Sequence, residues 1–207
     1  MYAIFKRGFD IVVSLVTLLV LCPAFIVVII AIRLGSKGPA IFKQERAGKD
    51  ARPFVFYKFR TMSFDVDPFG ASPKSGDDLR ITKIGKFLRE YSLDELTQLF
   101  NILKGDMSIV GPRPLYVSQI QEWDDRQKKR LLVKPGLTGL AQISGRAALT
   151  REQKLEFDVE YVERASFGFD IKIIFETAKQ AIIRKDIYEN KYSENEITRG
   201  ENSAEDK

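Results

Sequence analysis

Two adjacent acidic residues, Asp94 and Glu95, follow Ser92 and lie between two stretches with the apolar spacing of helices. In one interpretation this is a capping box, in which Ser92 accepts a hydrogen bond from the backbone amide of Glu95 and the Glu95 side chain reaches back. In the other, a carboxylate at a helix N-terminus is held ionised, which suits a magnesium ligand or a nucleophile toward phosphorus. The two roles are compatible, and the spacing leaves both open.

Basic residues beside turn-forming residues occur along the chain around this acidic pair. They are Lys58 and Arg60 in the run Lys58–Met62, Arg89, Arg113 in Gly111–Pro114, and Arg146 after the run Gly136–Gln142. An arginine next to glycine or proline allows a guanidinium group and backbone amides to reach one phosphate together. Each cluster alone is typical of a solvated surface turn, but the combination with an acidic pair favours a phosphate site.

The residue types that the sequence lacks limit the kinds of catalytic and metal sites that it can form. The chain of 207 residues has no histidine, which excludes a catalytic histidine and a histidine-ligated metal. Cys22 is the only cysteine, so Cys-rich zinc sites and intrachain disulfides are excluded as well. Any metal must therefore have oxygen ligands, as Mg²⁺ or Mn²⁺ prefers. The net charge of +5 fits anionic partners but does not choose among lipid headgroups, nucleotides and nucleic acid.

The N-terminal segment predicts membrane insertion. No charged residue occurs from Ile11 to Ile32, which is long enough for a membrane helix of roughly 20 residues. Pro23 lies near the centre and is expected to kink the helix. Both flanks are basic, with Lys6 and Arg7 before the segment and Arg33 and Lys37 after it. Basic flanks on both sides favour a re-entrant helix, while a spanning helix stays open because membrane helices tolerate proline.

The remaining patterns predict a small domain rich in helices. Phe54–Phe59 is expected to be a strand, and Lys104-Gly105 is expected to end a helix. Helical spacing covers Ile84–Tyr91, Leu96–Leu103, Gln119–Leu132, Gln153–Arg164 and Ile171–Arg184. In the last of these, one face holds Ile171, Ile174, Phe175, Ala178 and Ile182. Packing on the core is the commoner use of such a face, and contact with a membrane is the alternative.

The domain boundaries follow from these patterns. We expect a membrane helix in residues 1–34, a catalytic domain in residues 35–188 and a disordered polar tail in residues 189–207. We expect the fold class to be an α-rich α/β domain with a membrane helix, which we expect to be re-entrant, although the residues alone leave a spanning helix equally open.

The chain resembles the bacterial sugar transferases, the monotopic phosphoglycosyl transferases, in their minimal form. The matching motifs, in order, are Lys6-Arg7 to Asp10, the proline-broken segment, Tyr57–Met62, Ser92–Leu96, Gln98–Asn101, Lys104–Ser108, Gly111–Leu115 and Pro135–Gly139. So many matches in one order make the resemblance specific. One departure is the pair Cys22-Pro23, where the family usually has Ser-Pro, because a thiol is a weaker hydrogen-bonding group.

The resemblance implies a two-step reaction. Asp94 attacks the sugar-bearing phosphate of a UDP-sugar and expels UMP, and undecaprenyl phosphate then takes the phosphosugar. Glu95 is the implied magnesium ligand, with Asp94 beside it. The implied substrate contacts are Lys58, Arg60, Arg89, Arg113, Pro114, Gln142 and Arg146. Asp170 matches an acidic family position of less certain role.

The resemblance also implies amphipathic helices at the membrane surface and a location at the cytoplasmic face of the bacterial inner membrane. The expected partners are a UDP-sugar, undecaprenyl phosphate and membrane lipids, without nucleic acid. The product would enter a capsule, exopolysaccharide, O-antigen or glycoprotein glycan. The sequence leaves the sugar and any homo-oligomer undetermined. The alternative from another class is a membrane-tethered nucleic-acid-binding or scaffolding module, although no aromatic-plus-basic motif of such a module is visible.

Overall fold

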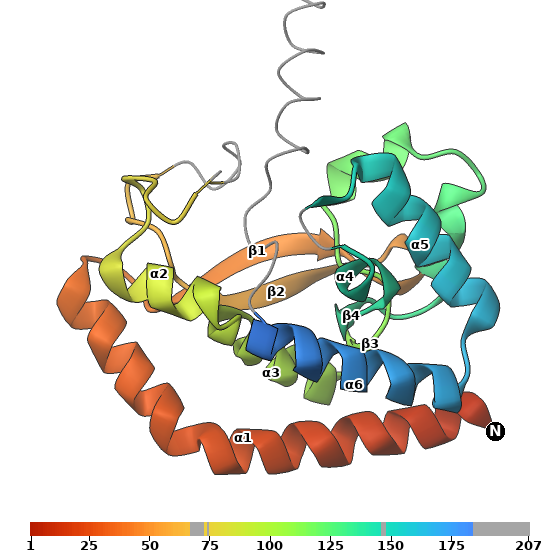
Figure 1. Cartoon of the computed structure of the whole chain (residues 1–207), viewed down its shortest axis with the longest axis horizontal. Helices are drawn as coiled ribbons and strands as arrows, with labels where there is room; N and C mark the ends of the chain where they lie inside the picture. The colour runs from red at the N-terminus through yellow and green to blue at the C-terminus, as the bar shows by residue number, and fades with distance from the viewer. Residues whose placement is uncertain (67–72, 74, 146–147, 184–207) are drawn as a thin grey trace, which may run out of the picture.

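The computed structural model describes residues 1–66, 73, 75–145 and 148–183. The long N-terminal helix α1 covers Tyr2–Gly35 and contains Pro23. Figure 1 shows α1 as two arms that meet at a bend, with the rest of the chain on the inner side of the bend. Proline has no N–H to donate within a helix, which accounts for a bend in this segment. The predicted tail, residues 189–207, lies outside the described residues.

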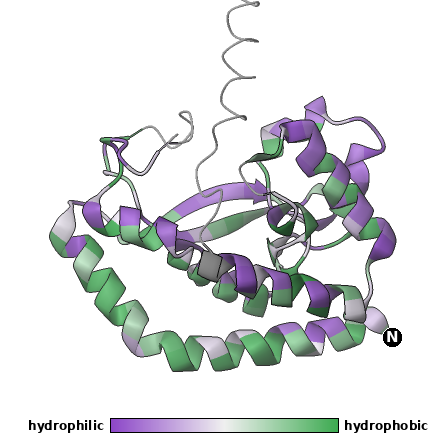
Figure 2. Ribbon diagram, viewed as in Figure 1, coloured by the Kyte–Doolittle hydropathy of each residue, from purple (hydrophilic) through white to green (hydrophobic). Residues whose placement is uncertain are grey.

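Apolar residues cover most of α1, as the colours in Figure 2 show. The helix is long and apolar enough to cross a membrane, and only 11% of its most apolar window is buried inside the protein. Exposed apolar residues on it include Ile4, Val12, Leu19, Val20, Val27 and Leu34. This confirms the predicted apolar membrane segment by length and composition.

Two small sheets make up the β structure of the described residues. Strands β1 (Ile41–Ala47) and β2 (Pro53–Phe59) pair in an antiparallel hairpin, and β3 (Ser108–Val110) pairs in parallel with β4 (Gly136–Thr138). The predicted strand at 54–59 is confirmed, whereas β1 was not predicted because its charged residues hide the alternation. The coarse fold class, helix-rich with strands, is confirmed.

Most of the predicted helices are present. They are α2 (Lys83–Glu90), the 3₁₀ helix η2 (Leu93–Gln98) with α3 (Leu99–Lys104), α5 (Arg151–Arg164) and α6 (Phe167–Ile183). The short helix α4 (Leu140–Ile143) was not predicted. The short 3₁₀ helix η1 (Lys49–Ala51) lies in the turn between β1 and β2. Gly105 ends α3 with φ of 95°, a left-handed conformation that glycine adopts without strain, as predicted.

One predicted helix is wrong. The segment Gln119–Leu132 forms two 3₁₀ helices, η3 (Val117–Glu122) and η4 (Gln127–Leu132), with a break between them. At the break, the Asp124 side chain accepts a hydrogen bond from the Gln127 backbone N–H at 2.7 Å. A short polar side chain that satisfies a local backbone donor competes with the continuous helix that the apolar spacing favoured.

The expected buried face of α6 is also wrong in part. Ile173 is fully buried in the core, whereas Phe175 is 72% exposed and Ala178 is exposed. Asp170 explains this rotation, because it lies in the first turn of α6 and binds residues of α1 and α5. Fixing Asp170 inward places Ile173, one turn later, in the core.

The N-terminal arm of α1 is attached to the domain by a cluster that we call the α1 anchor: Tyr2, Lys6, Tyr161 and Asp170. Lys6 Nζ and Tyr2 Oη each lie 2.7 Å from Asp170 Oδ2, and Tyr161 Oη lies 2.7 Å from Asp170 Oδ1. Every oxygen of this buried carboxylate therefore has a partner. Burial and the neighbouring Asp170 raise the pKa of Tyr161, which keeps its hydroxyl protonated as a donor.

Three further groups attach α1 to the domain. Arg7 donates to the carbonyls of Ile102 and Leu103, at 2.6 and 2.9 Å, and so caps the C-terminal end of α3. Asp10, which is buried, accepts from the backbone N–H of Ile109 at 3.0 Å. At the other end of α1, Arg60 donates to the carbonyl and hydroxyl of Ser36 at 3.0 and 2.9 Å. Both ends of α1 thus contact the same domain.

Candidate active site

The acidic pair lies on η2, immediately after α2. Ser92 precedes it with φ of 54°, and its side chain makes no capping hydrogen bond among the described residues. The Glu95 side chain instead extends toward Arg113 and Lys58. The capping-box interpretation is therefore wrong. The left-handed turn at Ser92 rotates the backbone so that both carboxylates face β2 and the loop after β3.

Two basic side chains meet these carboxylates, and we call the four residues Lys58, Asp94, Glu95 and Arg113 the charged cluster. Lys58 Nζ lies 2.8 Å from Asp94 Oδ2 and 3.7 Å from Glu95 Oε1. Arg113 forms a two-pronged pair with Glu95, at 2.6 Å to Oε1 and 3.3 Å to Oε2. Among the described residues, no other side chain binds the Asp94 carboxylate.

Exposure increases in order across the charged cluster. The Asp94 side chain is 3% exposed, Glu95 is 17%, Lys58 is 23% and Arg113 is 46%. A ligand would therefore meet Arg113 first and Asp94 last. This gradient suits a buried reactive carboxylate approached through a cationic entrance, where fixed charges act strongly because water is excluded.

Asn101 locks the strand that carries Lys58. This fully buried residue of α3 donates to the Val55 carbonyl at 2.7 Å and accepts from the Tyr57 backbone N–H at 3.1 Å. Because α3 continues directly from η2, the same side chain fixes the spacing between Lys58 and Asp94. Asn101 lies in the family motif Gln98–Asn101, and nothing in the spacing of that motif indicated this role.

The loop that carries Arg113 is held at both ends. On one side Gly111 N–H donates to the Thr138 carbonyl at 2.9 Å, and Gly136 N–H donates to the Pro112 carbonyl at 2.8 Å. On the other side the Ala47 N–H of β1 donates to the carbonyl of Leu115, after Pro114, at 2.9 Å. A Cβ on either Gly111 or Gly136 would collide with the opposite backbone. The glycines of the two predicted phosphate loops therefore bring those loops into contact with each other.

Arg46 is a basic neighbour of this site that the sequence analysis missed. Its guanidinium lies 3.7 Å from the centroid of the Tyr116 ring, and it donates to Gln44 Oε1 at 2.7 Å. Burial and the nearby Arg113 lower the pKa of Arg46, and Glu95 opposes that shift. Only the β1–β2 hairpin brings Arg46 near the cluster, and the strand β1 was itself not recognised in the sequence.

The other predicted contacts lie in different places. The Arg60 side chain is committed to Ser36 and Lys37 at the end of α1, and Arg89 Nε donates to Thr61 Oγ1 at 2.8 Å. Pro114 is buried within its loop. The Gln142 amide is buried, has no hydrogen-bond partner among the described residues and lies against Gly139. Arg146 lies outside the described residues. Substrate-binding roles for all five remain predictions.

The described residues contain no group of three acidic, cysteine or histidine side chains that could enclose a metal ion. The two carboxylates of Asp94 and Glu95 are nevertheless enough for Mg²⁺, which commonly takes one or two carboxylates and completes its shell with phosphate oxygens and water. Lys58 and Arg113 supply positive charge to both carboxylates in the structure.

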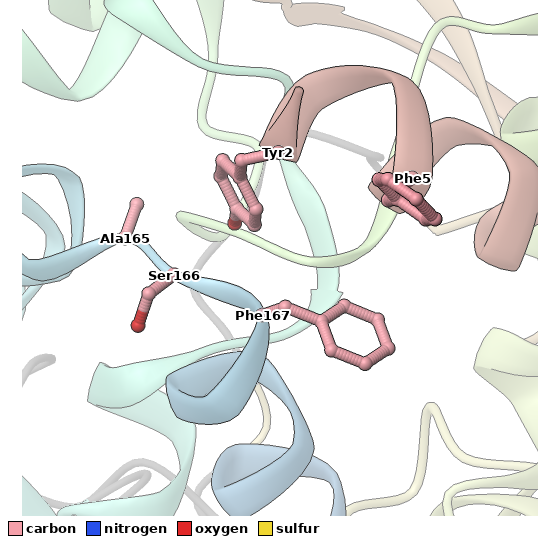
Figure 3. Close-up of a pocket in the computed structure, with 5 residues that line it drawn as sticks. All are labelled: Tyr2, Phe5, Ala165, Ser166 and Phe167. Atoms are coloured by element: carbon pink, nitrogen blue, oxygen red, sulfur yellow. The ribbon is translucent and has the colours of Figure 1, made fainter.

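A separate hollow of about 340 Å³ lies at the start of α1. Figure 3 shows its lining from α1 and from the start of α6, namely Tyr2, Phe5, Ala165, Ser166 and Phe167. It shares no residue with the charged cluster. Its apolar lining adjoins the exposed apolar surface of α1.

Comparison with known proteins decides the family. A family model described as bacterial sugar transferase matches residues 1–184. The chain belongs to the bacterial sugar transferase family. This confirms the resemblance inferred from the sequence motifs.

Three relatives of this sugar transferase illustrate the range of names and chain lengths among similar proteins. An uncharacterized sugar transferase, EpsL of Bacillus subtilis, is 41% identical over 91% of this chain and 93% of its own length. A UDP-glucose:undecaprenyl-phosphate glucose-1-phosphate transferase of Klebsiella pneumoniae is 42% identical over 89% of this chain and 42% of its own length. An undecaprenyl-phosphate galactose phosphotransferase of Salmonella typhimurium is 39% identical over 87% of this chain and 41% of its own length. These names support the predicted enzyme class, a phosphoglycosyl transferase.

Proposed function

We propose that this sugar transferase moves a sugar 1-phosphate from a UDP-sugar to undecaprenyl phosphate and releases UMP, as the first membrane step of a bacterial glycan. The observation that carries the proposal is the buried Asp94, held 2.8 Å from Lys58 beside the Arg113–Glu95 pair. The scaffolding alternative leaves this arrangement without a role, because scaffolding does not require acidic and basic side chains to converge around a buried aspartate. The names of the curated relatives support the same substrates.

The exposure gradient supports the two-step reaction that the family resemblance implies. An Asp94 oxygen attacks the phosphorus that carries the sugar, the bond from that phosphorus to the UMP oxygen breaks, and UMP leaves with the bonding electrons. A phosphate oxygen of undecaprenyl phosphate then attacks the same phosphorus, which restores the Asp94 carboxylate. Lys58 orients Asp94 and neutralises charge on the phosphate, while Arg113 at the entrance neutralises the departing phosphate. Mg²⁺, held by Glu95 and Asp94, would supply further positive charge to the diphosphate.

The arrangement of α1 supports a re-entrant topology. One end of α1 binds the domain through Lys6 and Asp170, and the other end binds it through Ser36 and Arg60. A single domain lies on one side of a membrane, so both ends of α1 lie on that side, and the bend enters the bilayer. UDP-sugars are soluble, so we place the domain at the cytoplasmic face of the inner membrane.

Helix α6 supports the same placement. It leaves Phe167 and Phe175 exposed, by 44% and 72%, and Figure 1 shows it running beside the N-terminal arm of α1. Exposed aromatic side chains beside a membrane helix are typical of an interfacial helix. The membrane alternative for α6 is therefore the one we propose.

The test is UMP release by the detergent-purified protein over a panel of UDP-sugars, with undecaprenyl phosphate as acceptor. We expect release with one or a few sugars and its loss in EDTA, with recovery on adding Mg²⁺. A scaffold would release no UMP from any sugar. Full release in EDTA would remove the metal from the mechanism while leaving the transfer itself in place.

A further inference from the structure

Arg130 and Asp158 form the most buried ion pair in the described part of the chain, with side chains 2% and 3% exposed. Arg130 Nε and Nη2 lie 3.1 and 2.7 Å from Asp158 Oδ2. The guanidinium also lies 4.8 Å from the centroid of the Trp123 ring. Removing two charges from water is costly, and such a pair is often no more stabilising than apolar residues of the same size. Its presence therefore calls for a role beyond stability.

The partner of this pair is the backbone of Arg113. Arg130 Nη2 donates to the Arg113 carbonyl at 2.5 Å. Burial raises the pKa of Asp158, and Arg130 and the backbone of Arg113 oppose that shift. The ion pair thus lies at the backbone of Arg113 and is bonded to its carbonyl.

The loop needs this support at Arg113 in particular. Its sequence is Gly111-Pro112-Arg113-Pro114, and the two prolines have no N–H to donate. The Gly111 N–H and the Pro112 carbonyl are bonded to β4, and the Leu115 carbonyl is bonded to β1. Arg113 is the middle of the loop, and its carbonyl receives a part-buried hydrogen bond from Arg130. Leaving a buried carbonyl without a partner costs about 1–3 kcal/mol, and a part-buried one costs less.

We propose that Arg130 and Asp158 are positioning residues that fix the Arg113 backbone so that its guanidinium meets Glu95 at the entrance of the charged cluster. The pair acts only through Arg113 and does not touch substrate. We call the contact of Arg130 and Asp158 with the Arg113 backbone the clamp. The inference rests on the proposed function for its activity readout, but the clamp itself can be measured separately.

The experiment is a double-mutant cycle on kcat/KM for UMP release. Arg130→Met keeps the long stem over Trp123 but removes the charge, and it is made alone and together with Arg113→Ala. We expect Arg130→Met alone to lower kcat/KM by about tenfold or more, since small displacements of a positioning group are that costly. In the Arg113→Ala background it should change kcat/KM by less than about twofold. Equal losses in both backgrounds would overturn the proposal, and so would no loss with Arg113 present.

Two further variants distinguish a loss of activity from a loss of folding. Arg130→Lys keeps the charge but cannot bind both Asp158 and the Arg113 carbonyl in the same way, so it should restore folding and only part of the activity. Val159→Ala is the matched control, because Val159 is fully buried next to Asp158 in the sequence of α5 and has no polar side-chain group that could bond to the loop. It should lower the thermal midpoint while leaving kcat/KM within about twofold of wild type.

Hydrogen–deuterium exchange supplies a readout that does not depend on catalysis. Arg130→Met should speed exchange in peptides covering residues 111–116, whereas Val159→Ala should not. Unchanged exchange in this loop would overturn the clamp even if Arg130→Met lowered UMP release. If wild type released no UMP while the loop loosened as expected, the proposed function would fail and the clamp would stand.

Discussion

Two clusters in this molecule use the same pair of groups, an aspartate and a lysine at hydrogen-bonding distance, in opposite ways. In the α1 anchor, both oxygens of Asp170 are occupied, by Lys6 and two tyrosine hydroxyls. In the charged cluster, the Asp94 carboxylate has Lys58 as its one side-chain partner in the described part of the chain. A carboxylate whose two oxygens both accept hydrogen bonds from buried or part-buried protein groups has a structural role. One with capacity left beside a cationic entrance is available for chemistry.

The largest expected effect tests the difference in role between Asp94 and Asp170 directly. Asp94→Asn should abolish UMP release with little loss of stability, because the side chain keeps its shape and Lys58 stays partly solvated. Asp170→Asn should do the opposite and lower stability by about 3 kcal/mol, because it leaves the Lys6 ammonium without a charged partner in a mostly buried site. Thermal unfolding in detergent and the rate per folded molecule separate the two. If Asp170→Asn abolished turnover while Asp94→Asn kept it, the assignments would be reversed.

A smaller effect is expected at the entrance of the charged cluster. Arg113→Ala should lower kcat/KM by about 10²–10³-fold, which corresponds to about 2.7–4 kcal/mol, the scale for loss of one electrostatic donor. The matched control is Arg164→Ala, because Arg164 is also exposed and also paired with a glutamate, Glu160, at a distance from the cluster. Its substitution should leave kcat/KM within about twofold. Equal losses in the two variants would show that Arg113 contributes only general charge.

The smallest effect concerns the bend between the two arms of α1. Single cysteines replacing Ala3 and Lys37, in a Cys22→Ser background, should react equally with an impermeant thiol reagent added to inside-out vesicles. Both positions are exposed at the two ends of α1. Pro23→Leu removes a helix-interior proline, whose cost is about 3 kcal/mol, and so should favour the straight form. Labelling of the two sites from opposite sides in wild type would show a spanning helix.

The sequence predicted those parts of the molecule that depend on local patterns. The apolar run of α1, the strand at 54–59 and the glycine end of α3 follow from hydropathy and backbone preferences, and all are present. The ordered motifs also pointed to Asp94, Glu95, Lys58 and Arg113, which the fold brings together. The apolar spacing at residues 119–132 predicted one continuous helix, and this was wrong because the Asp124 side chain starts a new turn.

Features that depend on contacts far apart in the sequence could not be predicted. Arg60 and Arg113 both stand in basic motifs beside turn formers, but the first binds the end of α1 and the second binds Glu95. Likewise Asp158 reads as one acid among several on a charged helix, and its pairing with Arg130 arises only when α5 packs on η4. Such roles are set by tertiary contacts and leave no signal in the spacing.

The most direct test of the central claim is intact-protein mass spectrometry after incubation with the UDP-sugar that gives UMP release, without lipid acceptor. Wild type should gain the mass of one phosphosugar, and undecaprenyl phosphate should then remove it. Asp94→Asn should show no added mass, while Asp170→Asn, where folded, should show the same adduct as wild type. A phosphosugar adduct on Asp94→Asn, or steady UMP release by that variant, would contradict covalent transfer through Asp94.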